Sequence, residues 1–438
     1  MVVHLNVLSV SIEYTIPRNY RCALTVSEHG GGRRLTNTQI SHKVSDPYTL
    51  NSRYESFPIC SLITRSGHTS SARTLYTTSK YLIDSAAPSF ECSAPFAPVL
   101  AFGDSTTDTG NQIHTNTPFA TAASPPYGMT FFHEPTGRYS DGRVMLDFLC
   151  TALKIDFLPP HLTRSSQCAN ENFAVAGATA NNNAELQSIA NVTSLTDDTL
   201  EVQLSWFKND LQGHDLSKAL VYFGEVGGND YNYALGAMRP ANEVQALLPA
   251  VVEKIHNALE TILESGVKKV VVQGQFPMGC IAIYLKLFNN TQQLDSNGCV
   301  SSVMEISNEH NRMLRDVIGH VQKIHPDVDI IFFDTTEAYL HILRNPSIYN
   351  FNNVRDPCYT GGLELLALAN AGNTGGAAAA LLPPHNINMT SCTNPENYIG
   401  WDGIHLTDAM YGAMMKLFLT DARFTSPFPN FLTPCTNH

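Results

Sequence analysis

The sequence predicts an α/β fold in which a mostly parallel sheet is covered by helices on both faces. From about Cys92 onward, short apolar runs alternate with segments whose apolar residues recur every three or four positions. This alternation is typical of the strand–helix–strand units that build parallel sheets. Each strand-like run is short and nearly all apolar, as a strand covered on both faces must be.

The individual elements follow from these periods. A helix is expected over 244–262, where Val, Leu and Ile residues line one face, and Gly266 should end it. Two more amphipathic helices are expected over 303–324 and 407–419. The predicted strands are 99–102, 220–223, 270–272 and 330–333.

The composition changes near residue 91. The preceding residues are rich in Ser, Thr and Arg, contain few acidic residues and show no sustained apolar period. We expect 1–91 to be an N-terminal extension: a disordered segment, a plastid-type targeting segment or a mispredicted gene start. The apolar run 2–12 is interrupted by polar residues and makes a poor secretory signal. Residues 92–438 should form one domain, with 361–384 as a low-complexity, solvent-exposed insertion that carries no catalytic residue.

Charge and composition narrow the choice of partners. The chain has 438 residues, of which 43% are apolar, enough to bury a core. Its formal charge of −12 would repel nucleic acid and anionic membrane surfaces. No apolar stretch approaches the roughly 18–20 residues that cross a bilayer. We therefore expect a small-molecule substrate, no nucleic acid, no integral membrane segment, and a monomer.

Ten cysteines occur without a Cys-x-x-Cys pair and without histidines at ligand spacing. This pattern favours disulfides over a metal site and suggests an oxidising compartment, with buried free thiols as the alternative. Cys280 and Cys299 would close a short loop, and Cys358 and Cys392 flank the approach to a histidine motif, so we predict these two bridges.

Four short segments carry the candidate chemistry: Gly103-Asp104-Ser105, Gly177, 227–230 (Gly-Gly-Asn-Asp) and 402–405 (Asp-Gly-Ile-His). Ser105 lies three residues past the end of one predicted strand, and 227–230 follow the end of another. Both should therefore face the carboxyl edge of the sheet, where open α/β folds bind ligands.

The residue types in these segments suit nucleophilic catalysis. A serine hydroxyl needs a base within hydrogen-bond reach, and His405 is the candidate. Asp402 can accept the proton on the other ring nitrogen and stabilise the imidazolium. Spacing alone does not establish contact, because an aspartate before a helix is commonly a cap.

Longer blocks around these residues resemble a known family. They are 102–111 (FGDSTTDTGN), 137–143 (GRYSDGR), 172–179 (NFAVAGAT) and 401–407 (WDGIHLT). In this order they resemble the plant GDSL esterase/lipases, which are SGNH hydrolases, and most closely the secreted branch that includes sinapine esterase and acetylajmalan esterase. The resemblance runs from about Cys92 to the C-terminus.

The resemblance implies a three-layer α/β/α flavodoxin-like fold and ester hydrolysis through an acyl-serine intermediate. It implies Ser105 as nucleophile, His405 as base and Asp402 as the residue that orients it. The oxyanion donors would be the backbone N–H groups of Ser105 and Gly177 and the side-chain amide of Asn229. A side chain at position 177 would crowd the pocket. No metal or organic cofactor is implied.

Neighbouring polar residues are interpreted as structural. Asp104, Asp230, Asp108, Asn111 and the 138–143 block should hold loops by bonding backbone groups. Cys280 has no histidine in its motif and is not expected to be a nucleophile. The isolated histidines His133, His214, His310 and His320 are assigned no ligand role.

Three functions remain open from the sequence: ester hydrolysis, acyl transfer to an alcohol, and a non-catalytic secreted binding protein. The substrate would be a small acyl or hydroxycinnamoyl ester, or a lipid. Family resemblance, cysteines and sequons favour a secreted, extracellular or vacuolar protein, with a plastid location open. The candidate glycosylation sites are Asn191, Asn289 and Asn388.

Overall fold

The computed structural model describes residues 96–115, 120–164, 170–288, 292–361 and 390–427, together with the backbone of three strands near the N-terminus. The chain divides into two compact units, Met1–Ser85 and Ala86–His438. The first contains an antiparallel sheet of β1 (Val3–Val7), β2 (Val10–Tyr14) and β3 (Thr25–Glu28), which the sequence did not predict. The rest of the predicted extension 1–91, and the predicted insertion beyond Gly361, lie outside the described residues and stay predictions.

The second unit is built on a six-stranded sheet with the order β5-β4-β6-β7-β8-β9. The first five strands are parallel and β9 runs antiparallel to β8. In chain order the parallel strands read 2-1-3-4-5, the order of flavodoxin-like folds, and the predicted fold class is confirmed. The strands are β4 (Val99–Phe102), β5 (Glu171–Asn172), β6 (Leu220–Phe223), β7 (Lys269–Gln273), β8 (Asp329–Phe333) and β9 (Thr425–Ser426).

The four predicted strands are confirmed as β4, β6, β7 and β8. Almost every residue in them is buried, because helices cover both faces of the sheet. Only Lys269 and Asp329, where β7 and β8 begin, are not buried, and their side chains pair at 2.8 Å. The two edge strands have two residues each, too few for a period that sequence reasoning could detect.

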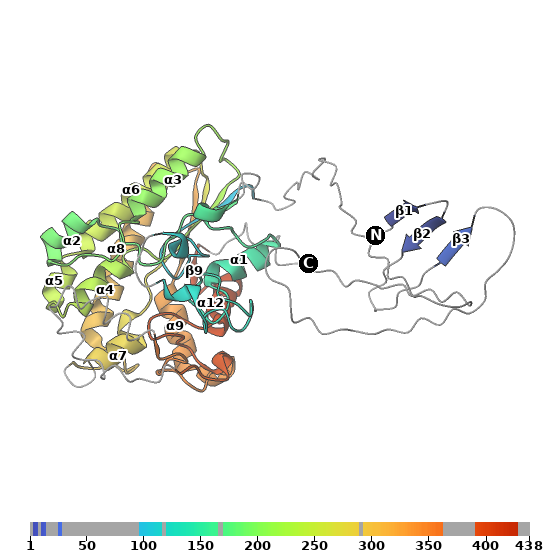
Figure 1. Ribbon diagram of the computed structural model, residues 1–438. Coiled ribbons are helices and arrows are strands. Elements are labelled where there is room, and N and C mark those ends of the chain that lie inside the picture. Colours follow the sequence, from blue (N-terminus) through green and yellow to red (C-terminus); the bar gives the residue numbers. More distant parts are fainter. Residues whose placement is uncertain are drawn as a thin grey trace. The chain divides into compact units, whose positions relative to one another are not determined.

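Helices form two layers around this sheet (Figure 1). α3 packs on α6 and α6 on α8, whereas α1 and α9 both pack on α12. No helix in the described part of the chain combines the length and apolar character that crossing a bilayer requires. The α-helices are α1 (Met145–Leu153), α2 (Asn183–Ala190), α3 (Leu200–Asp210), α4 (Gly228–Gly236), α5 (Ala241–Gln245), α6 (Leu248–Glu264), α7 (Ala282–Phe288), α8 (Ser301–Ile324), α9 (Thr335–Arg344) and α12 (Asp408–Thr420). The short 3-10 turns are η1 (Gln112–His114), η2 (Thr121–Ala123), η3 (His161–Thr163), η4 (Met278–Cys280), η5 (Pro346–Tyr349) and η6 (Pro395–Asn397).

The helix predicted over 244–262 is two helices, and the prediction was wrong on this point. α5 ends at Gln245 and α6 begins at Leu248. Pro249 lies in the first turn of α6, where the missing N–H of a proline is tolerated. The apolar period continues across the break between the two helices, which is why the sequence suggested a single helix. Gly266 follows the end of α6 with a φ of +97°, which suits a glycine after a helix.

A buried ion pair fixes the 138–143 block. The Arg138 guanidinium makes two hydrogen bonds of 2.8 Å to the Asp147 carboxylate, which is fully buried. Asp147 also accepts a bond from the Val144 N–H at the start of α1. Arg138 reaches the Thr109 carbonyl at 3.3 Å, so the pair ties α1 to the loop after β4. The block's second arginine, Arg143, pairs with Asp408 of α12 at 2.9 Å.

We expect Arg138→Met to lower the free energy of unfolding by about 3–5 kcal/mol, because it leaves the Asp147 carboxylate buried without a partner. Urea denaturation measures this change. The matched control is Arg312→Met, which removes an exposed ion pair on α8 and should change stability little. An Arg138→Met loss no larger than that of the control would contradict the assignment.

Candidate active site

The turn after β4 places Ser105 at the carboxyl edge of the sheet. Gly103 has a φ of +149°, and a Cβ there would lie 2.9 Å from the Thr107 hydroxyl, so the turn requires glycine. The Gln203 side chain holds Gly103 from both sides, accepting from its N–H at 3.0 Å and donating to its carbonyl at 2.8 Å. Asp104 accepts from the N–H and hydroxyl of Thr106, each at 3.0 Å. These hydrogen bonds hold Gly103, Asp104 and Ser105 in one rigid turn.

Three side chains form a hydrogen-bonded chain at this edge. His405 Nε2 lies 2.8 Å from Ser105 Oγ, and His405 Nδ1 lies 2.7 Å from Asp402 Oδ2. Ser105 and His405 are separated by 300 positions in the sequence. All three are buried, with Ser105 8% and His405 7% exposed, which leaves a narrow approach to the reactive atoms.

Asp402 is held ionised by its neighbours. Burial opposes this, but the charge of His405 and hydrogen bonds from His405 and Tyr127 outweigh it and lower the pKa of Asp402. An ionised carboxylate can only accept, so His405 Nδ1 carries the hydrogen in that contact. When the His405 ring is neutral, its Nε2 is then the acceptor, and the Ser105 hydroxyl donates to it.

Tyr127 is a site residue that the sequence did not reveal. Its hydroxyl donates to Asp402 Oδ2 at 2.8 Å, across 275 positions of the chain. The ring packs edge-on against Trp401 at 5.8 Å. A second aromatic residue, Tyr139, has its ring centroid 4.6 Å from that of the His405 ring. The only local signal was an aromatic residue about ten positions before the 137–143 block. Aromatic residues are too common for this to select a partner for Asp402.

The second strand-end segment approaches from β6. Gly227 has a φ of +98° and precedes α4, whose second residue is Asn229. The Asn229 amide donates to the Ala178 carbonyl at 3.0 Å, next to Gly177. One of its two amide hydrogens is used there, and Asn229 also lines the cavity beside Ser105.

The backbone conformation at Gly177 suits glycine. Its φ is +85°, and an added Cβ would meet Thr196 and Tyr233 at ordinary distances of 3.5 and 3.6 Å. A Cβ therefore does not clash with the protein itself, and the expectation that a side chain would crowd the substrate pocket stays a prediction. A non-glycine residue would instead be strained at this φ.

Buried carboxylates hold the loops at this edge, as predicted. Asp230 accepts from the N–H groups of Ala180 and Asn181 at 2.8 and 3.0 Å, which joins the Gly177 turn to α4. Burial raises the pKa of Asp230 to about 6, although these bonds oppose the shift. Asp108 accepts from four backbone N–H groups between positions 110 and 176. The Asn111 amide donates to the carbonyls of 172 and 174 at 2.7 and 2.9 Å.

A small cavity opens beside the reactive serine. Its volume is about 40 Å³. Ser105, Asn229 and His405 are among the residues that line it. The remaining lining residues are Asp104, Thr106, Glu225, Asn232, Gln275, Phe276, Met278, Ile281, Tyr284, Ile404, Leu406 and Tyr411.

Both predicted disulfides are formed. Cys280 is bonded to Cys299, and Cys358 to Cys392. Among the described cysteines, Cys150 is free and buried. Of the candidate glycosylation sites, Asn191 is exposed at the end of α2, and Asn289 and Asn388 lie outside the described residues.

One group in the described part of the chain has the composition of a metal site: His161, Glu171 and Asp210. Arg164 occupies the space between the carboxylates, at 3.0 Å from Glu171 and 2.7 Å from Asp210. His161 Nδ1 lies 2.6 Å from Glu171. The guanidinium pairs with both carboxylates, so the group is an ion-pair network.

The chain is similar to one family of enzymes over most of its length. A family model described as GDSL-like Lipase/Acylhydrolase matches residues 99–418. A GDSL esterase/lipase of Arabidopsis thaliana is 35% identical over 350 residues, covering 76% of this chain and 88% of the relative. Another from the same plant is 32% identical over 362 residues, covering 76% and 85%.

Two solved structures show weaker likeness. A variant of an acetyl-xylooligosaccharide esterase from Geobacillus is 15% identical, with a TM-score of 0.31, covering 64% of this chain and 94% of that chain. A phospholipase A1 from Streptomyces albidoflavus is also 15% identical, with a TM-score of 0.29, covering 56% and 81%. Neither carries an argument about this chain's substrate.

A buried histidine lies behind the Gly227 turn. His310 of α8 is 1% exposed, and its Nδ1 lies 2.9 Å from the Tyr231 hydroxyl. Burial lowers the pKa of His310 to about 4. His310 is therefore a core residue, and its lack of a ligand role stays a prediction.

The His310 shift predicts a pH-dependent stability. Between pH 6.5 and about 4 the unfolded chain binds a proton at this ring that the folded chain does not, so acid destabilises the fold. Relative to His310→Gln, the wild type should lose up to about 3 kcal/mol of unfolding free energy from pH 7 to pH 4. Denaturant titrations at several pH values measure the difference. A difference that stays constant across this window would refute a buried neutral ring.

Proposed function

Because the chain belongs to the GDSL-like lipase/acylhydrolase family and is a carboxylic ester hydrolase, we propose that it cleaves esters through an acyl intermediate on Ser105. The observation that carries this proposal is the 2.8 Å contact between Ser105 Oγ and His405 Nε2, backed by the 2.7 Å contact from His405 to Asp402. His405 takes the serine proton as Oγ attacks the carbonyl carbon. Asp402 stabilises the imidazolium that results.

The tetrahedral intermediate places negative charge on the former carbonyl oxygen. We propose the backbone N–H groups of Ser105 and Gly177 and the Asn229 amide as its donors. The Asn229 bond to the Ala178 carbonyl and the Asp230 bonds to Ala180 and Asn181 support this assignment. They hold two separate donor segments together, so the donors need no rearrangement when charge develops. His405 then returns its proton to the leaving alcohol, and water resolves the acyl-serine.

The two disulfides also support a proposed location. Cys280–Cys299 and Cys358–Cys392 persist only where thiols are not kept reduced. We therefore propose passage through the secretory pathway, with glycosylation at the exposed Asn191. Treating the secreted protein with a peptide N-glycosidase would remove mass from the wild type and less from Asn191→Gln.

The Ser105 assignment is tested by labelling and turnover together. A fluorophosphonate should label the wild type at Ser105 and leave Ser105→Ala unlabelled. Hydrolysis of a p-nitrophenyl ester should fall at least about 10⁴-fold in Ser105→Ala. Ser347→Ala, at an exposed serine, is the matched control and should keep both. Retained hydrolysis in Ser105→Ala, or a label on another residue, would overturn the proposal.

Tyr127→Phe tests the support of Asp402. Losing one donor to a buried carboxylate should raise the Asp402 pKa and lower turnover about tenfold. The acid limb of the kcat/KM profile should move to higher pH, because an Asp402 carboxylate with one donor fewer stabilises the protonated form of the base more strongly. A merely structural role would leave that limb in place. Tyr349→Phe removes a phenol outside the site and should leave turnover and profile unchanged.

A further inference from the structure

The cavity beside Ser105 limits what the enzyme can hold. An apolar cavity of about 150 Å³ holds one benzene molecule. This cavity has a volume of about 40 Å³, so it takes only a few heavy atoms beyond the reacting carbon. Its lining combines polar side chains with a buried apolar group that includes Phe276, Met278, Ile281 and Tyr284, each less than 10% exposed. This apolar group suits a short hydrocarbon chain.

The cavity suits the acyl part of an ester rather than the alcohol. During hydrolysis the alcohol must leave and water must enter before the acyl group is released. The side occupied by the alcohol therefore needs access to solvent. A small cavity walled by buried side chains meets the opposite need, since it holds the group that stays attached to Ser105.

One wall of this cavity is braced. Met278 begins the η4 turn and Ile281 directly follows it; we call these two residues the η4 wall. Cys280 lies between them and is bonded to Cys299, just before α8 begins. The Gly279 carbonyl accepts from the Val300 N–H at 2.9 Å. The Met278 N–H donates to the Ser307 hydroxyl of α8 at 3.1 Å. The wall is thus fixed to the start of α8 by one covalent bond and two hydrogen bonds.

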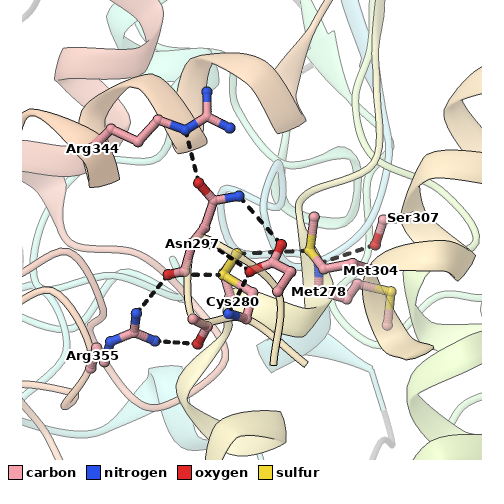
Figure 2. The surroundings of a disulfide bond; sticks show 10 residues. Met278, Cys280, Asn297, Met304, Ser307, Arg344 and Arg355 are labelled. Atoms are coloured by element: carbon pink, nitrogen blue, oxygen red, sulfur yellow. Dashed lines mark hydrogen bonds between the residues drawn. A yellow bond between two sulfur atoms is a disulfide. The ribbon is translucent and has the colours of Figure 1, made fainter. Parts of the chain in front are cut away.

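The far side of the disulfide is held as well (Figure 2). The Arg344 guanidinium donates to the Asn297 side-chain oxygen at 2.9 Å. Arg355 donates to the carbonyls of Asn297 and Gly298 at 2.7 and 2.6 Å. The loop that carries Cys299 is therefore held in place, and so is the η4 wall that the disulfide joins to it.

We propose that the braced η4 wall restricts this enzyme to esters of short acyl groups, of roughly two to four carbons. The inference rests on the proposed function, since it assigns the acyl end of the substrate of that same site. A longer chain would have to displace buried side chains, and overpacking of this kind is strongly unfavourable. A long-chain lipid is then a poor substrate, whatever its alcohol.

The first test is an acyl-length series of p-nitrophenyl esters with the wild-type protein. We expect kcat/KM to fall at least about tenfold from the acetyl or butyryl ester to the octanoyl ester. Higher kcat/KM for octanoyl or palmitoyl esters would overturn the short-acyl inference and leave the proposed function intact. Hydrolysis of no ester at any length, by folded protein, would instead defeat the proposed function itself.

The second test moves the wall. Ile281→Ala should raise the octanoyl-to-acetyl ratio of kcat/KM at least about tenfold, because it lengthens the cavity. Ile348→Ala, at an isoleucine that is 71% exposed, is the matched control and should leave the ratio unchanged. A ratio in Ile281→Ala equal to that of the control would contradict the η4 wall as the limit.

The brace is tested separately. Cys280→Ala combined with Cys299→Ala should raise the same ratio several-fold, since the wall is then held by hydrogen bonds alone. Removing the other disulfide, Cys358–Cys392, whose residues do not line the cavity, should leave the ratio unchanged. Equal ratios in the two disulfide variants would overturn the bracing role.

Discussion

The carboxylate of Asp402 is the group on which the geometry of the site depends. It accepts four hydrogen bonds: from the N–H groups of Ile404 and His405, from His405 Nδ1, and from the Tyr127 hydroxyl. The first two close the turn before α12, and the third sets the plane of the imidazole ring. Nε2 then has one direction in which to point, toward the strand end that carries Ser105. A carboxylate that was protonated or displaced would lose the turn, the ring orientation and the serine contact together.

The sheet supplies the other half of the geometry. In the flavodoxin-like strand order, β4 and β6 lie side by side and the chain departs from them in opposite directions, so a crevice opens at their carboxyl ends. Ser105 follows β4 and Asn229 follows β6. The loops at this edge have backbone N–H groups that no strand ladder satisfies, and Asp108 and Asp230 accept from them instead. Buried carboxylates thus give fixed shape to loops that would otherwise be irregular.

Much of this could be predicted from the sequence, for identifiable physical reasons. Strands such as β4 and β6 are easily predicted, because a strand that is buried on both faces has a continuous run of apolar residues. The 300-residue contact between Ser105 and His405 was expected because each residue sits in a distinctive block. Both disulfides followed from the placement of their cysteines in the chain. Each of these features could be predicted from a short stretch of sequence.

Other features depend on tertiary contacts that leave little local trace. Tyr127 reaches Asp402 across 275 residues, and nothing around Tyr127 specifies that partner. The break between α5 and α6 preserves the apolar period, so the period could not reveal it. The backbone conformation of Gly177 was not predicted, because φ cannot be read from residue type alone. The identity of a glycine was predictable, and its conformation was not.

Direct trapping of the acyl group on Ser105 is the closest test of the acyl-serine intermediate. Turnover of an ester is stopped with acid within milliseconds, the protein is digested, and the masses of its peptides are measured. The peptide containing Ser105 should gain the mass of the acyl group while product is being formed, and this adduct should disappear when substrate is exhausted. Product formation with no acyl mass on that peptide, or with the mass on a different residue, would exclude Ser105 as the residue that carries the acyl group.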